Sequence, residues 1–262
     1  ALWSSGQPIL NGWCSIGNSF TAEIMAAQGY DSVTVDIQHG ALDYSDVLPM
    51  FQAMQSSGAT LMARVPWRDP GYIMKALDVG AMGIICPMIN NSEEAAEFIS
   101  YMRYPPLGQR SFGPTRVAVS VPDYGVEAND EVLAFAMIET ADGVQNLEAI
   151  AATAGLDGIY VGPADLTLGT QLGRLAPGLD RTEDEMVTLI QKVASVCKEY
   201  GLIAGIHCGT AEYASKAIGW GYNLTTIGGY TRLLASAAAA SVSSWRKLTG
   251  RKEKAQVTGG VY

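Results

Sequence analysis

The chain has 262 residues, of which 48% are hydrophobic and 16% charged, and its net charge at neutral pH is -9. This composition is typical of a globular protein with a full core and excludes an intrinsically disordered chain. The negative charge argues against a nucleic-acid partner, because phosphate binding requires clustered Lys and Arg, which occur here only in the segment 246–254.

Short apolar runs alternate with longer helical patterns along the whole chain. Eight runs predict strands, at 11–17, 32–38, 59–65, 83–88, 133–139, 157–163, 202–208 and 223–228. Between and after them lie helical patterns, several starting on Ser, Thr or Asp and most ending on Gly, at 19–29, 43–58, 69–80, 91–103, 143–155, 182–201, 210–221 and 231–248. Strict strand–helix alternation predicts a parallel sheet. Eight units favour a (β/α)8 TIM barrel over the alternative, a doubly wound open sheet.

The alternation predicts one barrel domain, residues 1–250, followed by a C-terminal tail, residues 251–262. Two insertions interrupt it: 104–130, which has four prolines and little helical period, and 164–181, which follows the sixth strand. Long loops of this kind in a compact barrel are usually lids or binding elements, and we expect that role for both.

The spacing of the cysteines and the length of the apolar runs indicate the cellular compartment in which the protein is expected. The four cysteines, at 14, 86, 197 and 208, are too widely spaced for a zinc motif and too few for a disulfide scaffold, so reduced thiols are expected. The first ten residues lack the pattern of a signal peptide, and no run reaches the roughly 18 apolar residues of a membrane span. We expect a cytoplasmic protein with no membrane partner.

Polar residues at the ends of barrel strands are the candidates for a site, because the chemistry of such barrels gathers there. Glu139 and Asp165 follow consecutive strands, so their carboxylates should converge and repel each other unless a cation lies between them. Oxygen ligands favour a divalent metal, Mg²⁺ or Mn²⁺ first, with Co²⁺ or Zn²⁺ also compatible. The alternative is that each carboxylate caps the helix that follows it.

Arg64 ends a strongly apolar run, so its guanidinium needs a partner. That partner is either a substrate carboxylate or carbonyl oxygen, or a structural ion pair with Asp36 or Asp69. His39, beside carboxylates, suits proton transfer, although a histidine in a loop is also commonly a hydrogen-bonded surface residue. Asp78 lies at a helix end that disfavours an acid, which indicates a partner elsewhere.

His207 lies inside the seventh apolar run, and we interpret it as a packed residue rather than a catalytic one. The segment "VGPADL", residues 161–166, places backbone N–H groups at a turn after the sixth strand, where they can hold a carboxylate.

Four segments together resemble the HpcH/HpaI aldolase family of metal-dependent class II pyruvate aldolases: "DIQHG", "RVPWRDPGYIMKALDVGAMGIICPM", "AMIET" and "YVGPADL". The resemblance extends through most of the chain. It implies reversible aldol cleavage of a 4-hydroxy-2-oxo acid to pyruvate, or a related 2-oxo acid, and an aldehyde. The small-molecule substrates are then a 2-oxo acid and an aldehyde, and the family implies a homohexamer, a trimer of dimers, with the last helix exchanged between subunits.

The resemblance also implies a role for each matching residue. Glu139 and Asp165 match the metal ligands, and the backbone of Ala164 and Asp165, in the turn that begins at Gly162, matches the binding point for the pyruvate carboxylate. Further roles are implied as follows: Arg64 contacts the C2 oxygen, His39 transfers a proton with water, Asp78 pairs with that histidine, Asp36 lies on the same loop, and Trp13 lies near the pyruvate methyl group.

Two features depart from the family pattern. Gln38 stands where a Glu is common, which removes a negative charge beside His39. The segment 110–116 adds Arg110 and Arg116, which we hypothesise contact a distal carboxylate of the substrate. The rival functions are a decarboxylase or CoA-ester lyase using the same chemistry, and a non-catalytic binding barrel.

Overall fold

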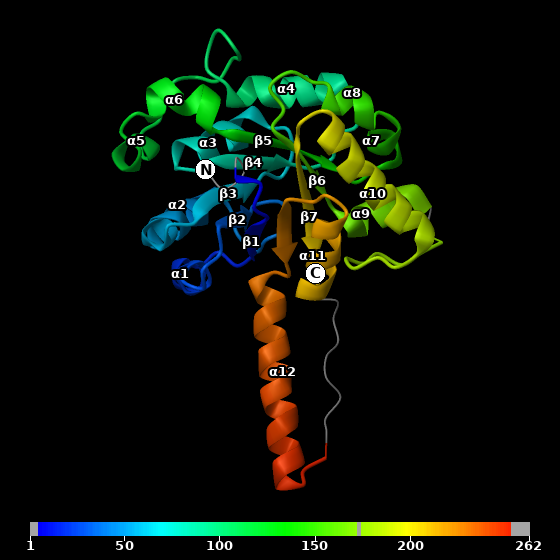
Figure 1. Ribbon diagram of the computed structural model, residues 1–262. Coiled ribbons are helices and arrows are strands. Elements are labelled where there is room, and N and C mark those ends of the chain that lie inside the picture. The colour runs from blue at the N-terminus through cyan, green and yellow to red at the C-terminus, as the bar shows by residue number, and fades with distance from the viewer. Residues whose placement is uncertain (1–4, 172–173, 253–262) are drawn as a thin grey trace.

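Eight parallel strands form a closed barrel in chain order, with β8 beside β1, in the computed structural model, which describes residues 5–171 and 174–252. The chain is therefore a single-domain (β/α)8 barrel, as predicted, and not an open sheet (Figure 1). The strands are β1 (Ile9–Cys14), β2 (Ser32–Asp36), β3 (Thr60–Arg64), β4 (Gly83–Cys86), β5 (Leu133–Ile138), β6 (Gly158–Val161), β7 (Ile203–Cys208) and β8 (Leu224–Ile227).

Helices follow the strands and, apart from α12, surround the barrel. They are α1 (Ser19–Ala26), α2 (Tyr44–Met54) with the short 3-10 turn η2 (Gln55–Ser57), α3 (Pro70–Asp78), α4 (Ser92–Met102), α7 (Ala141–Gln145), α8 (Leu147–Ala151), α10 (Asp184–Glu199), α11 (Ala211–Gly219) and α12 (Tyr230–Thr249). Several of these helices begin after a residue whose side chain accepts a hydrogen bond from a backbone N–H of the first turn, for example Asn18, Asp69 and Thr140. These caps fix where each strand-to-helix loop ends.

Both insertions contain helices, and the first is more helical than its sequence suggests. The first contains α5 (Val117–Ser120) and α6 (Tyr124–Glu131), and the second contains α9 (Pro163–Gln171). The first insertion connects α4 to β5, so it lies at the amino-terminal face of the barrel, and a lid over the opposite face is the wrong expectation for it. The second follows β6 and reaches the carboxyl-terminal face, although residues 172–173 lie outside the described part of the chain.

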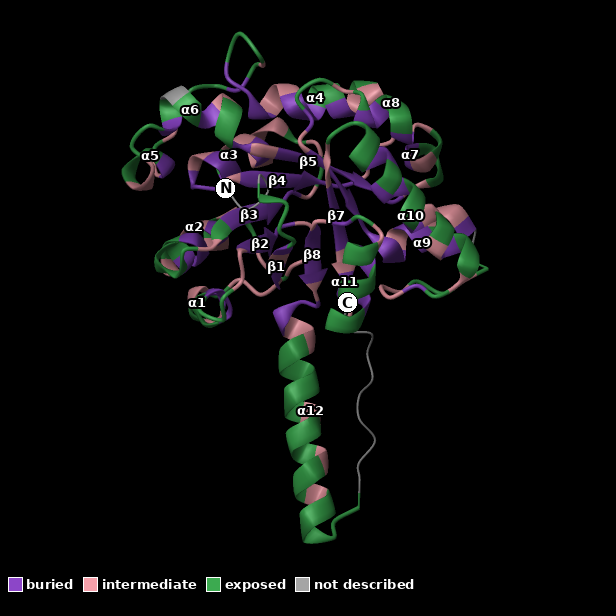
Figure 2. Cartoon of the chain, in the orientation of Figure 1, coloured by how far each residue is buried: buried purple, intermediate pink, exposed green. Residues whose placement is uncertain are grey.

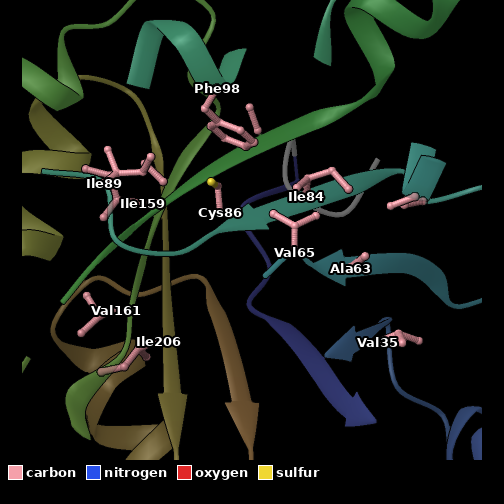
Figure 3. Close-up of a cluster of buried hydrophobic side chains, with 14 of the residues drawn as sticks. Val35, Ala63, Val65, Ile84, Cys86, Ile89, Phe98, Ile159, Val161 and Ile206 are labelled. Carbon is pink, nitrogen blue, oxygen red and sulfur yellow. The ribbon is translucent and has the colours of Figure 1, made fainter. Parts of the chain in front are cut away.

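The core has two layers because each strand buries both of its faces. Outward-facing side chains such as Val35, Cys86 and Ile206 pack against the helices (Figure 3). A second cluster fills the barrel itself and includes Trp13, Met62 and Tyr160. Side chains alternate between the two faces along a strand. The last inward-facing side chain of each strand therefore lies at the mouth of the barrel.

The helix α12 extends away from the barrel and is exposed along most of its length (Figures 1 and 2). Only its first residue, Tyr230, is buried, and its hydroxyl accepts from the Ile16 N–H at 2.6 Å. Within the described residues, none of the helices combines the length and the apolarity that crossing a bilayer would require. Residues 253–262 of the predicted C-terminal tail lie outside the description.

Candidate active site

A pocket of about 380 Å³ opens at the carboxyl-terminal mouth of the barrel. Its lining includes six of the residues predicted from sequence: Trp13, Asp36, His39, Arg64, Gly162 and Ala164. It also includes Ser15, Ala41, Met137, Leu179, His207, Gly229 and Thr231. Strand register explains the convergence, because Trp13, Asp36 and Arg64 are inward-facing residues at or near the ends of neighbouring strands.

Arg64 and Asp36 form a buried bidentate ion pair. Arg64 Nε donates to Asp36 Oδ1 at 2.8 Å and one Nη donates to Oδ2 at 2.6 Å, with the two residues 4% and 2% exposed. The Trp13 indole N–H also donates to Oδ2, at 3.2 Å, and the guanidinium lies 4.8 Å from the Trp13 ring. Of the two alternative ion pairs, the one with Asp36 is formed, whereas Asp69 caps α3 by accepting from Tyr72 N–H. The other Nη of Arg64 remains for an oxygen in the pocket.

Charge and hydrogen bonding keep this pair ionised. Burial alone would raise the pKa of Asp36, but the Arg64 charge and the bonds from Arg64, the His39 backbone and Trp13 outweigh it and lower the pKa. Asp36 Oδ1 also accepts from the backbone N–H groups of Gln38 and His39, at 3.2 and 3.3 Å. The carboxylate therefore fixes the loop that holds His39, an exposed residue, beside the pocket.

Glu139 lies one residue beyond β5 and is 2% exposed. Its Oε1 accepts from Met88 N–H at 2.9 Å, and Met88 adopts a left-handed backbone (φ 57°) to present that group. Gly162 leaves room for the other oxygen, because a Cβ there would lie 2.8 Å from Glu139 Oε2. The backbone around Glu139 therefore orients one oxygen and keeps space beside the second.

Asp165 lies in the first turn of α9, close enough to Glu139 to repel its charge. Burial and, to a smaller extent, Asp165 raise the pKa of Glu139 to about 7, although the Met88 N–H and Arg64 act in the opposite direction. The capping role that the sequence allowed for Glu139 is filled by Thr140, whose side chain accepts from Gly143 N–H.

The donor set fits a hard divalent cation held by few protein ligands. Among the described residues there is no group of three or more His, Cys, Asp or Glu side chains arranged for a metal. Two carboxylates that repel each other beside an open pocket, with space kept at Gly162, suit Mg²⁺ or Mn²⁺, which commonly take one or two carboxylates and complete their shell with water and substrate oxygens.

Asp78 is not among the pocket residues. It ends α3, on the side of the barrel where β4 begins, and pairs with Arg110 at 2.6 Å. Within one chain the structure brings His39 together with Asp36 and Arg64, and the pairing of Asp78 with His39 stays a prediction.

The two arginines of the first insertion have structural partners at the amino-terminal face. Arg110 is 1% exposed and lies between the rings of Tyr104 and Tyr124, while Arg116 donates to the Val79 carbonyl at 2.8 Å. Neither lines the pocket of its own chain, and the hypothesis that they contact a substrate carboxylate stays a prediction. They instead join the insertion to the end of α3.

His207 and Leu179 are two of the pocket residues that the sequence did not place in the site. His207 is inward-facing near the end of β7, and its ring packs edge-on against Trp13 with centroids 4.9 Å apart. The alternation of β7 was a usable signal, because it places His207 on the same face as Gly205, which packs against Tyr160 inside the barrel. Leu179 comes from the irregular second insertion, where no periodicity predicts direction.

Comparison with known proteins gives one consistent result. The family model described as HpcH/HpaI aldolase/citrate lyase matches residues 12–237. The chain is 37% identical over 247 residues to the hydroxypyruvate/pyruvate aldolase of Rhizorhabdus wittichii, covering 94% of this chain and 97% of that protein. It is 30% identical over 250 residues to the 5-keto-4-deoxy-D-glucarate aldolase of Klebsiella pneumoniae, covering 94% and 96%. A crystal structure of an HpcH/HpaI aldolase/citrate lyase family protein from Burkholderia cenocepacia superposes with a TM-score of 0.84 at 31% identity, covering 92% and 95%.

Proposed function

Because the chain belongs to the HpcH/HpaI aldolase/citrate lyase family, we propose that it cleaves a 4-hydroxy-2-oxo acid reversibly to pyruvate, or a related 2-oxo acid, and an aldehyde. Its relatives bear the names of aldolases, so its class is that of the carbon–carbon lyases. The observation that carries the proposal is that Arg64 and His39 line one pocket, while Glu139 and Asp165 lie beside Gly162 and Ala164, which line the same pocket.

Glu139 and Asp165 are the residues that would hold a divalent metal, Mg²⁺ or Mn²⁺ first and Co²⁺ or Zn²⁺ as alternatives. When bound, such an ion supplies positive charge that stabilises the negative charge developing on a 2-oxo acid as its carbon–carbon bond breaks. Both the presence of a metal at this site and its identity are proposed here.

Residues of this chain bind the substrate and transfer its protons. Arg64, held by Asp36 and Trp13, donates its remaining Nη–H to the C2 oxygen. The backbone N–H groups of Ala164 and Asp165, at the start of the nine-residue helix α9, bind the substrate carboxylate.

His39 takes the proton of the 4-hydroxyl, directly or through water, and returns a proton to the three-carbon product. Its loop is fixed by the bonds from its backbone and that of Gln38 to Asp36, which places the imidazole beside the pocket. Trp13 covers the Arg64 guanidinium and so excludes water from the bonds that orient it.

Removing divalent metal tests the proposal. After exhaustive EDTA treatment and desalting, the condensation of pyruvate or hydroxypyruvate with glycolaldehyde is expected to fall by at least about 100-fold, since the charge stabilisation is lost. Adding back Mg²⁺, Mn²⁺, Co²⁺ or Zn²⁺ singly should restore it and rank the metals. Product analysis with oxaloacetate measures decarboxylation in parallel. Full aldol activity after chelation would contradict the metal-dependent mechanism, and decarboxylation exceeding aldol turnover would favour the rival decarboxylase.

We also propose that the protein is a homo-oligomer, a hexamer built as a trimer of dimers, with α12 as a subunit contact. The support is a set of exposed apolar side chains on this projecting helix, which Figure 2 shows exposed along most of its length. They are Leu233, Leu234, Val242, Trp245 and Leu248. Exposed apolar area of this kind commonly marks an interface.

Light scattering coupled to size exclusion tests the oligomer. Leu234→Glu, which places a charge in the exposed apolar set, is expected to lower the molar mass of the assembly, whereas Ser236→Glu, at an exposed position on the opposite face of the same helix, should not. A wild-type mass of about 28 kDa, the mass of one chain, would contradict the proposal.

A further inference from the structure

The pocket contains a histidine that the proposed mechanism does not use. His207 lines the pocket and packs edge-on against Trp13, the residue that covers the Arg64 guanidinium. Burial, together with the Arg64 charge, lowers the pKa of His207 to about 3, against the opposing effect of Asp36. The imidazole is therefore uncharged under working conditions, and it acts through a hydrogen bond rather than through charge.

A chain of buried hydrogen bonds inside the barrel begins at Asn11. Its Oδ1 accepts from the hydroxyls of Ser32 and Thr34, at 2.8 and 3.1 Å, and its Nδ2 donates to Thr226 Oγ1 at 2.9 Å. The Thr226 hydroxyl, which receives this bond, has its own proton to donate. The acceptor within reach is the oxygen of Tyr160, 2.7 Å away, and both residues are fully buried.

The direction of the Thr226–Tyr160 bond sets which nitrogen of His207 carries the proton, because either hydroxyl can be its donor. When Thr226 donates to Tyr160, the Tyr160 proton points to His207 Nδ1, 3.4 Å away, which then acts as the acceptor. A neutral imidazole with an accepting Nδ1 carries its proton on Nε2. That nitrogen has no partner among the described side chains, so it presents an uncharged N–H donor to a ligand in the pocket.

We propose, building on the aldolase function above, that His207 is a specificity-determining residue whose Nε2–H donates to a hydroxyl on the carbon beside a reacting carbonyl. The ligand class is an α-hydroxy carbonyl compound. Two sources share this chemistry: a 3-hydroxy-2-oxo acid such as hydroxypyruvate, and a 2-hydroxyaldehyde such as glycolaldehyde.

The neighbours of His207 explain why a hydroxyl is the group recognised. Arg64 and the Glu139–Asp165 region already provide the positive charge and the proposed metal site for carboxylate and keto oxygens. A neutral donor that packs against Trp13, as Arg64 also does, adds no further charge, and it suits a neutral oxygen of the substrate. A deoxy analogue would leave this donor without a hydrogen-bond partner on the ligand, which disfavours its binding.

The test compares kcat/KM for substrates that differ only in the hydroxyl. The donor arm pairs hydroxypyruvate with pyruvate, and the acceptor arm pairs glycolaldehyde with acetaldehyde. His207→Phe keeps the ring and removes the donor, so the ratio of hydroxylated to deoxy substrate should fall by about tenfold in one arm, which identifies the source. His207→Gln, which keeps an N–H, should retain most of that ratio. Leu179→Ala, which only widens the same pocket, should change both substrates of a pair in proportion.

Ratios that stay within about twofold of wild type in both arms, or equal losses for hydroxylated and deoxy substrates, would overturn the proposal. Calorimetric titration of the metal-loaded protein with the same four compounds separates this inference from the proposed function. If the wild-type protein forms no aldol product, a weaker affinity of His207→Phe for the hydroxylated compound alone still supports it, and equal affinities overturn it. ¹⁵N NMR of the imidazole gives a further check, because a proton on Nδ1 would contradict the hydrogen-bond chain.

Discussion

The Glu139→Gln variant should lose about 10³-fold or more in kcat/KM, yet unfold no more easily than wild type. The activity is lost because an amide is a poor ligand for a hard cation and cannot balance its charge. The fold is retained because the amide oxygen still accepts from Met88 N–H, at the position where Oε1 accepts at 2.9 Å. A residue that stabilises the fold would show the opposite pattern.

The pH dependence of stability follows from the direction of the pKa shift of Glu139. In the folded, metal-free protein its pKa is raised from 4.5 to about 7, so the folded state holds the proton more tightly than the unfolded state. The stability contributed by Glu139 is therefore greatest below the unfolded value and declines as pH rises toward 7. Above that range, a shift of this size costs the folded state about 3 kcal/mol.

Urea unfolding of EDTA-treated protein at pH 5 and pH 8 provides the measurement. Glu139→Gln should exceed wild type in free energy of unfolding at pH 8, and the difference should narrow at pH 5. Glu148→Gln, the same substitution at an exposed position of α8, is the control and should change neither activity nor the pH dependence. A destabilised Glu139→Gln at pH 8 would show that the carboxylate supports the fold and would remove the argument for a ligand there.

Arg64→Ala should destabilise the protein by about 3–5 kcal/mol and abolish aldol activity, because it leaves the 2%-exposed Asp36 carboxylate without its partner. The double variant Arg64→Ala/Asp36→Ala removes both charges and should recover much of the lost stability without recovering activity. The two roles of Arg64, pairing with Asp36 and donating to the substrate, are thereby separated.

Chemical denaturation and pyruvate condensation rates check this prediction. Arg68→Ala breaks a more exposed pair, with Glu94 and Glu97, and as a control should cost less than about 1 kcal/mol. Activity restored in the double variant would rule out a direct contact between Arg64 and the substrate. Single-variant stability close to that of wild type would show that Asp36 finds another partner.

The first insertion illustrates where a local pattern is insufficient. Residues 104–130 resembled a lid because they are long and contain several prolines. Whether a loop lies at the mouth depends on whether it follows a strand or a helix, and this one follows α4. Arg110 then pairs with Asp78, 32 positions earlier in the chain, through packing between the insertion and α3 that no spacing indicates.

The barrel and six of the residues that line the pocket could be predicted from the residue pattern. Apolar runs mark strands that are buried on both faces, and a polar residue such as Asp36 or Arg64 at the end of a run marks the mouth. The partners of these residues, in contrast, follow from packing in three dimensions: Arg64 with Asp36, Asp78 with Arg110, and His207 with the hydrogen-bond chain from Asn11. Burial can be predicted because buried positions are mostly apolar. Which two side chains pair depends instead on strand register and helix packing, which bring together residues far apart in the chain.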